Sequence, residues 1–241
     1  DVFVLVDDDD PTEAWAPDAE LRHVGRPAPR QDGLLRASGA AEYTVDVQLA
    51  GMLHAHVLRS PVAHGRVAAL DLDAARACPG VRAVIGPSSP VGFDGEPLLT
   101  GEPTYAGQPV AVVAADTPAQ AATALTALAA AFEPLAHVVD PDEALREQRF
   151  TEEPEEDLRG DVDAAWAEAD VIVELELETP AHLQTPLEPH AAVAQWTAGE
   201  LTAWISTQGM FVARDDLAKR FGLAREQVRV ITRFFGGGFG S

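Results

Sequence analysis

The chain has 241 residues, 46% of them hydrophobic, which is enough for one or two domains with a buried core. Its 39 acidic residues outnumber its 17 basic ones and give a formal net charge of −22. Binding to nucleic acid or to an anionic membrane surface requires Lys and Arg to neutralise phosphate groups, so neither is expected as a partner. We also expect no membrane insertion, because no apolar run approaches the ~18 residues that a spanning helix needs.

The single cysteine, Cys78, excludes an internal disulfide and any iron–sulfur or Cys-type zinc site held by this chain alone. One cysteine is compatible with a reducing compartment. We therefore expect a cytoplasmic location, with the periplasm as the alternative.

The negative charge is concentrated in two stretches. Residues 1–31 carry eight acids and three bases, and residues 140–178 carry sixteen acids and three bases. Acidic residues with prolines and no periodicity are typical of solvated connectors. The sequence thus predicts an acidic, proline-containing connector over 1–31 and an acidic interdomain connector over 146–165, with the apolar run 3–6 compatible with a short strand.

Between these stretches the pattern predicts a small mixed domain. Strands are expected over 52–59, 66–72, 81–85 and 109–115. A short helix over 73–78 has Asp73 as a plausible N-cap, and a longer helix over 119–131 has Thr117 as its cap and Pro118 in its first turn.

The C-terminal part combines strands with one amphipathic helix. Apolar and acidic residues alternate from Val173 to Glu178, which predicts a half-buried strand over 171–178. Two further strands, over 191–196 and 201–205, flank a short turn and predict a hairpin. A helix over 211–221 ends before Gly222, and a strand over 228–232 leads into a glycine-rich run.

That run, Gly-Gly-Gly-Phe-Gly at 236–240, is the most informative motif. Consecutive glycines after a buried strand permit positive φ and let backbone N–H groups converge on an anion. The spacing of Gly236, Gly238 and Gly240 does not match G-x-G-x-x-G, and the P-loop Gly-Lys pair is absent, so a nucleotide-binding dehydrogenase is disfavoured. A flexible turn beside a packed Phe239 accounts for the run equally well on this evidence alone.

Other residues near this run add chemistry. Residues 201–241 carry six bases and three acids, a charge that favours an anionic ligand or forms a solvated face. Gln208 follows a strand and precedes a helix, where its amide offers two donors and one acceptor. Glu188 lies between Pro186 and Pro189, which suits either a positioned acid or a rigid turn.

A series of short motifs follows a recognisable order along nearly the whole chain. They are GRP (25–27), RQDG (30–33), SGAAEYT (38–44), LRSPVAHGR (58–66), PGV (79–81), GQPVA (107–111), GD (160–161), AD (169–170), LEPH (187–190), STQ (206–208) and GGGFG (236–240). In this order they resemble the molybdenum-cofactor-binding large subunit of the xanthine dehydrogenase, aldehyde oxidase and carbon monoxide dehydrogenase family. The resemblance implies an α+β fold, with an α/β-hammerhead domain over 32–145 followed by the first part of a molybdopterin-binding domain over 166–241.

The resemblance also implies roles for individual residues. Gln208 resembles the glutamine whose amide hydrogen-bonds an oxo ligand of molybdenum, and it is the expected catalytic and cofactor-binding residue. Phe239 and Gly240 resemble the pair beside the metal and the dithiolene end of the cofactor. The glycines Gly236, Gly237 and Gly238 would let the backbone approach there. No residue is expected to ligate the metal directly, because the pterin holds it.

The family's reaction is the oxidative hydroxylation of an aldehyde or an N-heterocycle, with water as the oxygen source. Its general base, a glutamate, and further cofactor loops are expected beyond residue 241. A molybdopterin cofactor, in its dinucleotide form, is implied, together with iron–sulfur and FAD domains or subunits in an oligomer of heteromers. The alternative is a non-catalytic binding or assembly module that retains the hammerhead fold.

Overall fold

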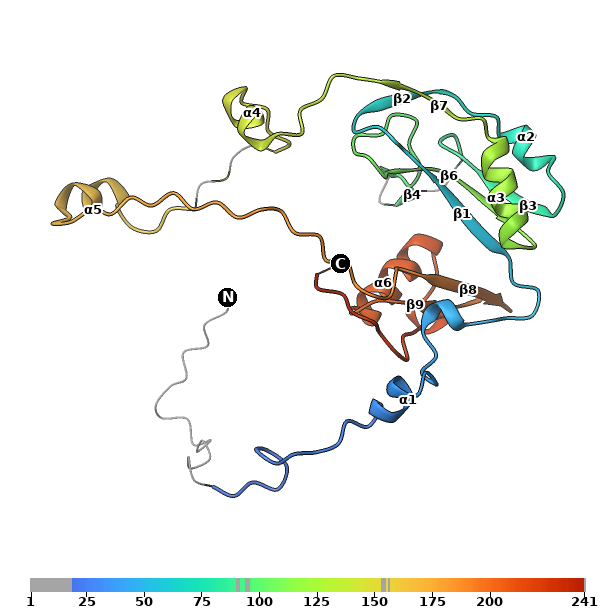
Figure 1. Cartoon of the computed structure of the whole chain (residues 1–241), viewed down its shortest axis with the longest axis horizontal. Coiled ribbons are helices and arrows are strands. Elements are labelled where there is room, and N and C mark those ends of the chain that lie inside the picture. The colour runs from blue at the N-terminus through green and yellow to red at the C-terminus, as the bar shows by residue number, and fades with distance from the viewer. Residues whose placement is uncertain (1–18, 90–91, 94–95, 153–154, 156, 241) are drawn as a thin grey trace. The chain divides into compact units, whose positions relative to one another are not determined.

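A computed structural model describes residues 19–89, 92–93, 96–152, 155 and 157–240 (Figure 1). The predicted run over 3–6 and the first part of the 1–31 connector lie outside the described residues. The chain divides into two compact units, residues 1–42 and 43–241. In the first unit, helix α1 (Gly33–Ala37) follows Asp32, whose carboxyl oxygens accept hydrogen bonds from Arg30 and Arg36. These two bonds hold the pKa of Asp32 well below its usual range.

The second unit contains the remaining elements. In chain order they are η1 (Thr44–Asp46), β1 (His54–Arg59), β2 (Gly65–Ala69), α2 (Leu72–Arg76), β3 (Val81–Ile85), β4 (Gly92–Phe93), β5 (Glu96–Pro97), β6 (Pro109–Ala115), α3 (Pro118–Ala127), β7 (Ala131–Pro134), α4 (Pro141–Arg146), α5 (Val162–Glu168), β8 (Ala192–Thr197), β9 (Glu200–Ile205), α6 (Met210–Phe221), η2 (Arg225–Gln227) and β10 (Val228–Ile231). None of the helices in the described residues is long and apolar enough to cross a bilayer.

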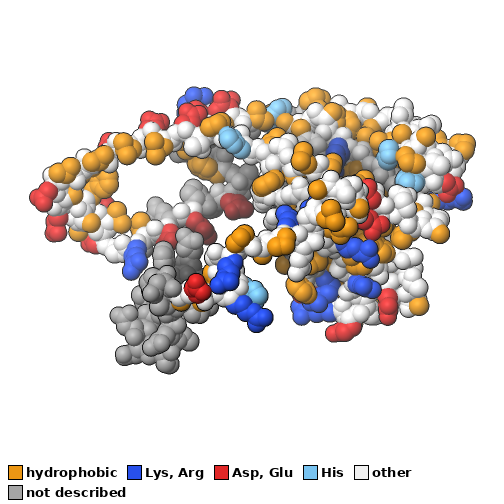
Figure 2. All heavy atoms as spheres, turned by 60° about the horizontal axis from the view of Figure 1, so that its bottom comes forward, with side chains coloured by type: hydrophobic (Ala, Val, Ile, Leu, Met, Phe, Trp, Pro, Cys, Tyr) orange, Lys and Arg blue, Asp and Glu red, His pale blue; other side chains and the backbone are white. Residues whose placement is uncertain are grey.

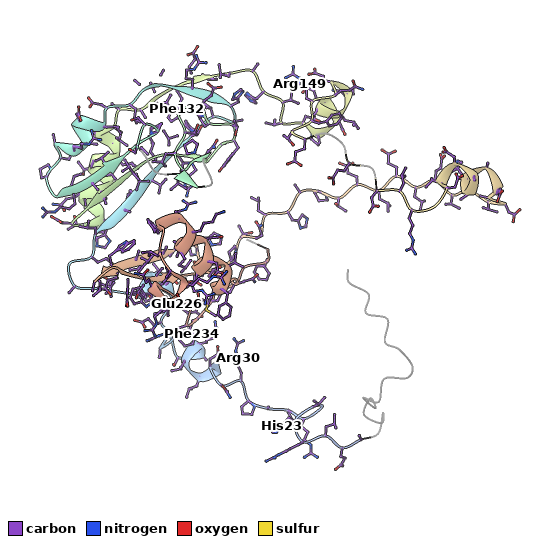
Figure 3. All side chains as sticks on the ribbon, turned by 180° about the vertical axis from the view of Figure 1, so that it is seen from behind. His23, Arg30, Phe132, Arg149, Glu226 and Phe234 are labelled. Atoms are coloured by element: carbon purple, nitrogen blue, oxygen red, sulfur yellow. The ribbon has the colours of Figure 1, made fainter. Side chains whose placement is uncertain are left out.

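A three-stranded antiparallel sheet, ordered β1-β6-β3, forms the centre of the first half of this unit. The central strand β6 carries the continuous apolar run that the sequence analysis identified, and Val110, Ala111 and Val113 on it are fully buried. Helix α3 packs against β1 and β6, and α2 packs against β3 and α3. The antiparallel pairs β2–β7 and β4–β5 complete this half. Phe132, labelled in Figure 3, lies on β7 and is the register partner of Val67 on β2.

Helix α3 begins as the sequence predicts and ends earlier. The Thr117 side chain accepts a hydrogen bond from the backbone N–H of Gln120 at 3.2 Å, and Pro118 occupies the first turn. The predicted helix over 119–131 instead stops at Ala127, because Ala129 takes a positive φ of 46° and β7 begins at Ala131. Pairing with β2 thus overrides the helix propensity of the alanine run.

The N-cap of α2 lies two residues before the predicted one. Asp71, not Asp73, accepts a hydrogen bond from the backbone N–H of Ala74, at 2.8 Å. Asp73 lies in the first turn and binds Arg76 at 2.7 Å. Asp71 and Asp73 both fit the capping pattern, and the helix begins at Leu72, directly after Asp71.

The predicted strand over 171–178 is not formed. Residues 169–191 contain no helix or strand, and Val173, Leu175 and Leu177 are exposed. An alternating pattern becomes a strand only when a neighbour satisfies its backbone groups, and the described residues supply no such partner. Figure 2 shows hydrophobic side chains uncovered on the extended segments of the chain.

The second sheet has the order β10-β9-β8. Strands β8 and β9 form the predicted hairpin, and Ala198 and Gly199 in its turn both have positive φ. Helix α6 follows β9 and ends at Phe221. The next residue, Gly222, has a φ of 63°, and its backbone N–H donates to the carbonyl groups of Ala218 and Lys219, which forms a left-handed cap. Strand β10 then pairs with β9 in parallel.

Truncating a core side chain tests this packing. Leu128 is fully buried in the cluster formed by α2, α3, β3 and β6, so Leu128→Ala is expected to lower the free energy of unfolding by about 2–5 kcal/mol. Leu177 is 87% exposed, and Leu177→Ala should change that free energy by less than about 0.5 kcal/mol. Urea unfolding followed by circular dichroism compares the two variants, and equal losses would contradict the assigned core.

Candidate functional site

The parallel pairing of β9 and β10 brings Gln208 and the glycine run to one edge of the second sheet. Trp204 and Ile231, near the ends of the two strands, are register partners. The hydroxyl of Thr232 donates a hydrogen bond to the carbonyl of Ile205 at 2.6 Å. The segments after both strands therefore leave the sheet together, at the carboxyl ends of parallel strands where α/β folds commonly build ligand sites.

The turn that carries Gln208 is held by hydrogen bonds on both sides. Before it, the backbone N–H of Ala191 donates to the hydroxyl of buried Ser206 at 2.9 Å, which fastens the turn to β8. After it, the N–H of Gly209 donates to the hydroxyl of Thr207 at 3.1 Å. Gln208 itself is exposed between these two anchors, at the end of a strand and before a helix as predicted.

Gln208 lies directly against Gly238. A Cβ added to Gly238 would be 2.5 Å from the Gln208 amide nitrogen and 2.9 Å from Cζ of Phe235. Gly238 is buried, so the absence of its side chain is what lets the loop pack on the glutamine. Two predicted site residues that are thirty positions apart are in this way brought together.

The first glycine of the run packs on Glu188. The backbone N–H of Gly236 donates to Oε2 of Glu188 at 2.7 Å, and a Cβ on Gly236 would overlap Cβ of Glu188. The other carboxyl oxygen, Oε1, accepts from the backbone N–H of Thr44 at 3.4 Å. Glu188 is only 8% exposed, and its two carboxyl oxygens are satisfied by these backbone donors.

The rest of the run has strained or open backbone. Gly237 has a φ of 122°, and a Cβ there would lie 3.0 Å from the ring of Phe239. Phe239 also takes a positive φ, of 55°, and its side chain is 74% exposed. Gly240 has a φ of 90° and nothing within 4 Å of its Cβ position. The outward-facing members of the site are thus Gln208, Phe239 and Gly240.

These contacts give a different explanation of why glycine occupies positions 236, 237 and 238. The family resemblance implies that Gly236, Gly237 and Gly238 let the backbone approach a cofactor. In the structure each of the three makes a close approach to the chain itself, to Glu188, Phe239 and Gln208 respectively. Phe234, just before the run, packs on Tyr43 with ring centroids 5.9 Å apart (Figure 3).

Two of the arginines expected beside the run form ion pairs within the same stretch of chain. Arg214 and Arg225 both bind the carboxyl group of Asp215, each at 2.8 Å. Arg214 also lies over the ring of Phe211, 5.4 Å from its centroid. Because Asp215 is one of the three acids already counted in this stretch, these pairs leave its excess of positive charge unchanged. The described residues contain no group of three or more His, Cys, Asp or Glu placed to hold a metal ion.

The motif series that carried the family resemblance corresponds to two family models. A model described as the a/b hammerhead domain of aldehyde oxidase and xanthine dehydrogenase matches residues 38–136. A model described as a molybdopterin cofactor-binding domain matches residues 145–241. The α+β fold, a hammerhead domain followed by part of a molybdopterin-binding domain, agrees with both matches.

Individual relatives give the same result. The molybdenum-binding subunit PaoC of an aldehyde oxidoreductase from Escherichia coli is 34% identical over 92% of this chain, and the chain covers 31% of it. The large molybdopterin subunit of nicotinate dehydrogenase from Eubacterium barkeri is 33% identical over 90% of the chain, which covers 55% of that subunit. The crystal structure of quinoline 2-oxidoreductase from Pseudomonas putida 86 superposes with a TM-score of 0.74 at 27% identity, over 88% of this chain and 30% of that one.

Adding one methyl group tests the packing of the glycine run on Gln208. Gly238→Ala is expected to displace the Gln208 amide and to lower the free energy of unfolding by about 1 kcal/mol, because the atoms that must move are the end of an exposed side chain and the edge of the Phe235 ring. It should also shift the side-chain amide NMR signals of Gln208. Gly101→Ala is the matched control, since its Cβ would lie 3.8 Å from Pro87, an ordinary contact distance. Unshifted Gln208 signals in Gly238→Ala would contradict the geometry.

Proposed function

Because the chain belongs to the family of molybdenum-binding large subunits that includes aldehyde oxidase and xanthine dehydrogenase, we propose that it is part of a molybdenum hydroxylase. The chain spans about a third of PaoC and of the carbon monoxide dehydrogenase large chain. The proposed reaction is oxidative hydroxylation of an aldehyde or an N-heterocycle, with water as the oxygen source. The observation that carries the proposal is the placement of Gln208 and the glycine run at one sheet edge.

The residues at this edge suit a molybdopterin cofactor. Gln208 presents an amide with two donors and one acceptor, and the glycine run presents backbone with no side chain in the way at Gly240. Such groups form hydrogen bonds around a metal whose direct ligands come from an organic cofactor. We assign Gln208, Gly236, Gly237, Gly238, Phe239 and Gly240 as the cofactor-binding residues.

Bound here, the cofactor would supply the redox chemistry, a two-electron oxidation of substrate carbon. The chain's own part is to bind and orient. The Gln208 amide would donate a hydrogen bond to an oxygen of the cofactor centre. Phe239 offers an exposed aromatic face that would border the reacting region and exclude water from it.

The organisation proposed for the whole protein follows the resemblance. The hammerhead domain would extend over 32–145, the connector over 146–165 and the cofactor-binding part over 166–241. We propose the dinucleotide form of the cofactor, iron–sulfur and FAD groups on partner domains or subunits, and a cytoplasmic oligomer of heteromers acting on a small molecule. PaoC and the nicotinate dehydrogenase relative are each named as a subunit of a larger enzyme, which supports this assembly.

Metal analysis of the full-length protein tests the proposal. After expression in a host that makes the cofactor, we expect about one molybdenum and one pterin per polypeptide. Protein that matures with neither would instead be the non-catalytic module that keeps the hammerhead fold.

Removing the Gln208 amide tests the site. In the full-length enzyme, Gln208→Ala is expected to lower kcat by about 10–100-fold while the molybdenum content stays near that of the wild type. Gln195→Ala, an exposed glutamine on β8, is the matched control and should leave kcat unchanged. A wild-type rate in Gln208→Ala would remove Gln208 from the site.

A further inference from the structure

We propose that Glu188 is a positioning residue, which holds the glycine run in the place where Gln208 and Phe239 act on the cofactor. The inference rests on the proposed function and deepens it. The hydrogen bonds of the Glu188 carboxyl group are made to backbone N–H groups of the chain itself. Glu188 acts through the backbone N–H of Gly236, which it binds at 2.7 Å.

Glu188 is buried, although the residue before it is exposed. Leu187 is 98% exposed while Glu188, the next residue, is 8% exposed. An irregular segment that turns an apolar side chain to solvent and buries a carboxyl group loses hydrophobic stabilisation and desolvates a polar group. Hydrogen bonds to the buried group must offset that cost, and the two bonds in the structure go to Gly236 and Thr44.

The carboxyl group of Glu188 connects two distant parts of the chain. Its two oxygens bind backbone N–H groups at Thr44, in the 3-10 helix η1, and at Gly236, after β10. Pro186 and Pro189 restrict the backbone on both sides of Glu188. One side chain on a stiffened segment therefore fixes the position of the glycine run relative to the turn at 44–46.

The glycine run connects Glu188 to Gln208 through two close contacts. Gly236 has no room for a Cβ because Cβ of Glu188 lies there, and Gly238 has none because the Gln208 amide lies there. The two contacts are separated by Gly237 alone. A displacement of the run at Gly236 would thus reach the contact with the Gln208 amide through one intervening residue.

The test uses the full-length enzyme with its cofactor and three variants. Glu188→Ala removes both acceptor oxygens, and Glu188→Gln keeps the shape and one acceptor. Glu200→Gln, on an exposed residue at the start of β9, is the control. The measurements are molybdenum content, kcat and KM, the electron paramagnetic resonance spectrum of the Mo(V) state, and hydrogen exchange at the Gly236 amide.

For Glu188→Ala we expect molybdenum within about twofold of the wild type, an altered Mo(V) spectrum, faster exchange at Gly236 and kcat lowered by about tenfold or more, with a smaller change in KM. Glu188→Gln should recover part of the lost kcat, since one hydrogen bond remains. The control should match the wild type in all four measurements. A purely stabilising role would lower the yield or the melting temperature and leave the Mo(V) spectrum and kcat of the folded enzyme unchanged, which would overturn the proposal.

Two outcomes separate this inference from the proposed function. If Glu188→Ala does not fold, Glu188→Gln decides, and a wild-type spectrum and kcat in that variant overturn the inference. If the wild-type protein matures without molybdenum, the proposed function fails. Exchange at Gly236 in Glu188→Gln then decides whether Glu188 holds the run at all: faster exchange supports it, and unchanged exchange overturns it.

Discussion

The candidate site depends on one structural constraint, the parallel pairing of β9 with β10 through α6. A strand, a helix and a second parallel strand return the chain to the edge from which it left. The turn that carries Gln208 begins at this edge, and so does the segment that becomes the glycine run. The hydrogen bond from Thr232 to Ile205 closes the two strand ends onto each other. Without this pairing, Gln208 and Gly238 would be unrelated parts of the chain.

The glycine run shows how backbone and side chains interlock at this edge. Gly236, Gly237 and Gly238 each lack a Cβ where another residue occupies the space, and two of these three spaces are taken by polar side chains, Glu188 and Gln208. A loop held in this way has little freedom to adapt, which favours a preorganised site. The exposed Phe239 and Gln208 are presented to solvent by residues that are themselves packed.

The first half of the second unit was largely predictable because its signals are local. The apolar run of β6 and the Thr117-Pro118 start of α3 determine those elements within a few residues. The errors fall where tertiary pairing competes with propensity. Strand β7 begins at Ala131, the last residue that the alanine run would place in a helix. The alternating segment from Val173 to Glu178 stays unpaired in the described structure.

The order of short motifs was enough to indicate the family, and local patterns singled out Gln208 and the glycine run separately. The fold brings them into contact, because the parallel register of β9 and β10 is a long-range pairing that no local pattern encodes. It also decided what Glu188 does. Two flanking prolines indicate a stiff segment, but only the fold places the buried carboxyl group against the N–H of Gly236, a partner 48 residues away.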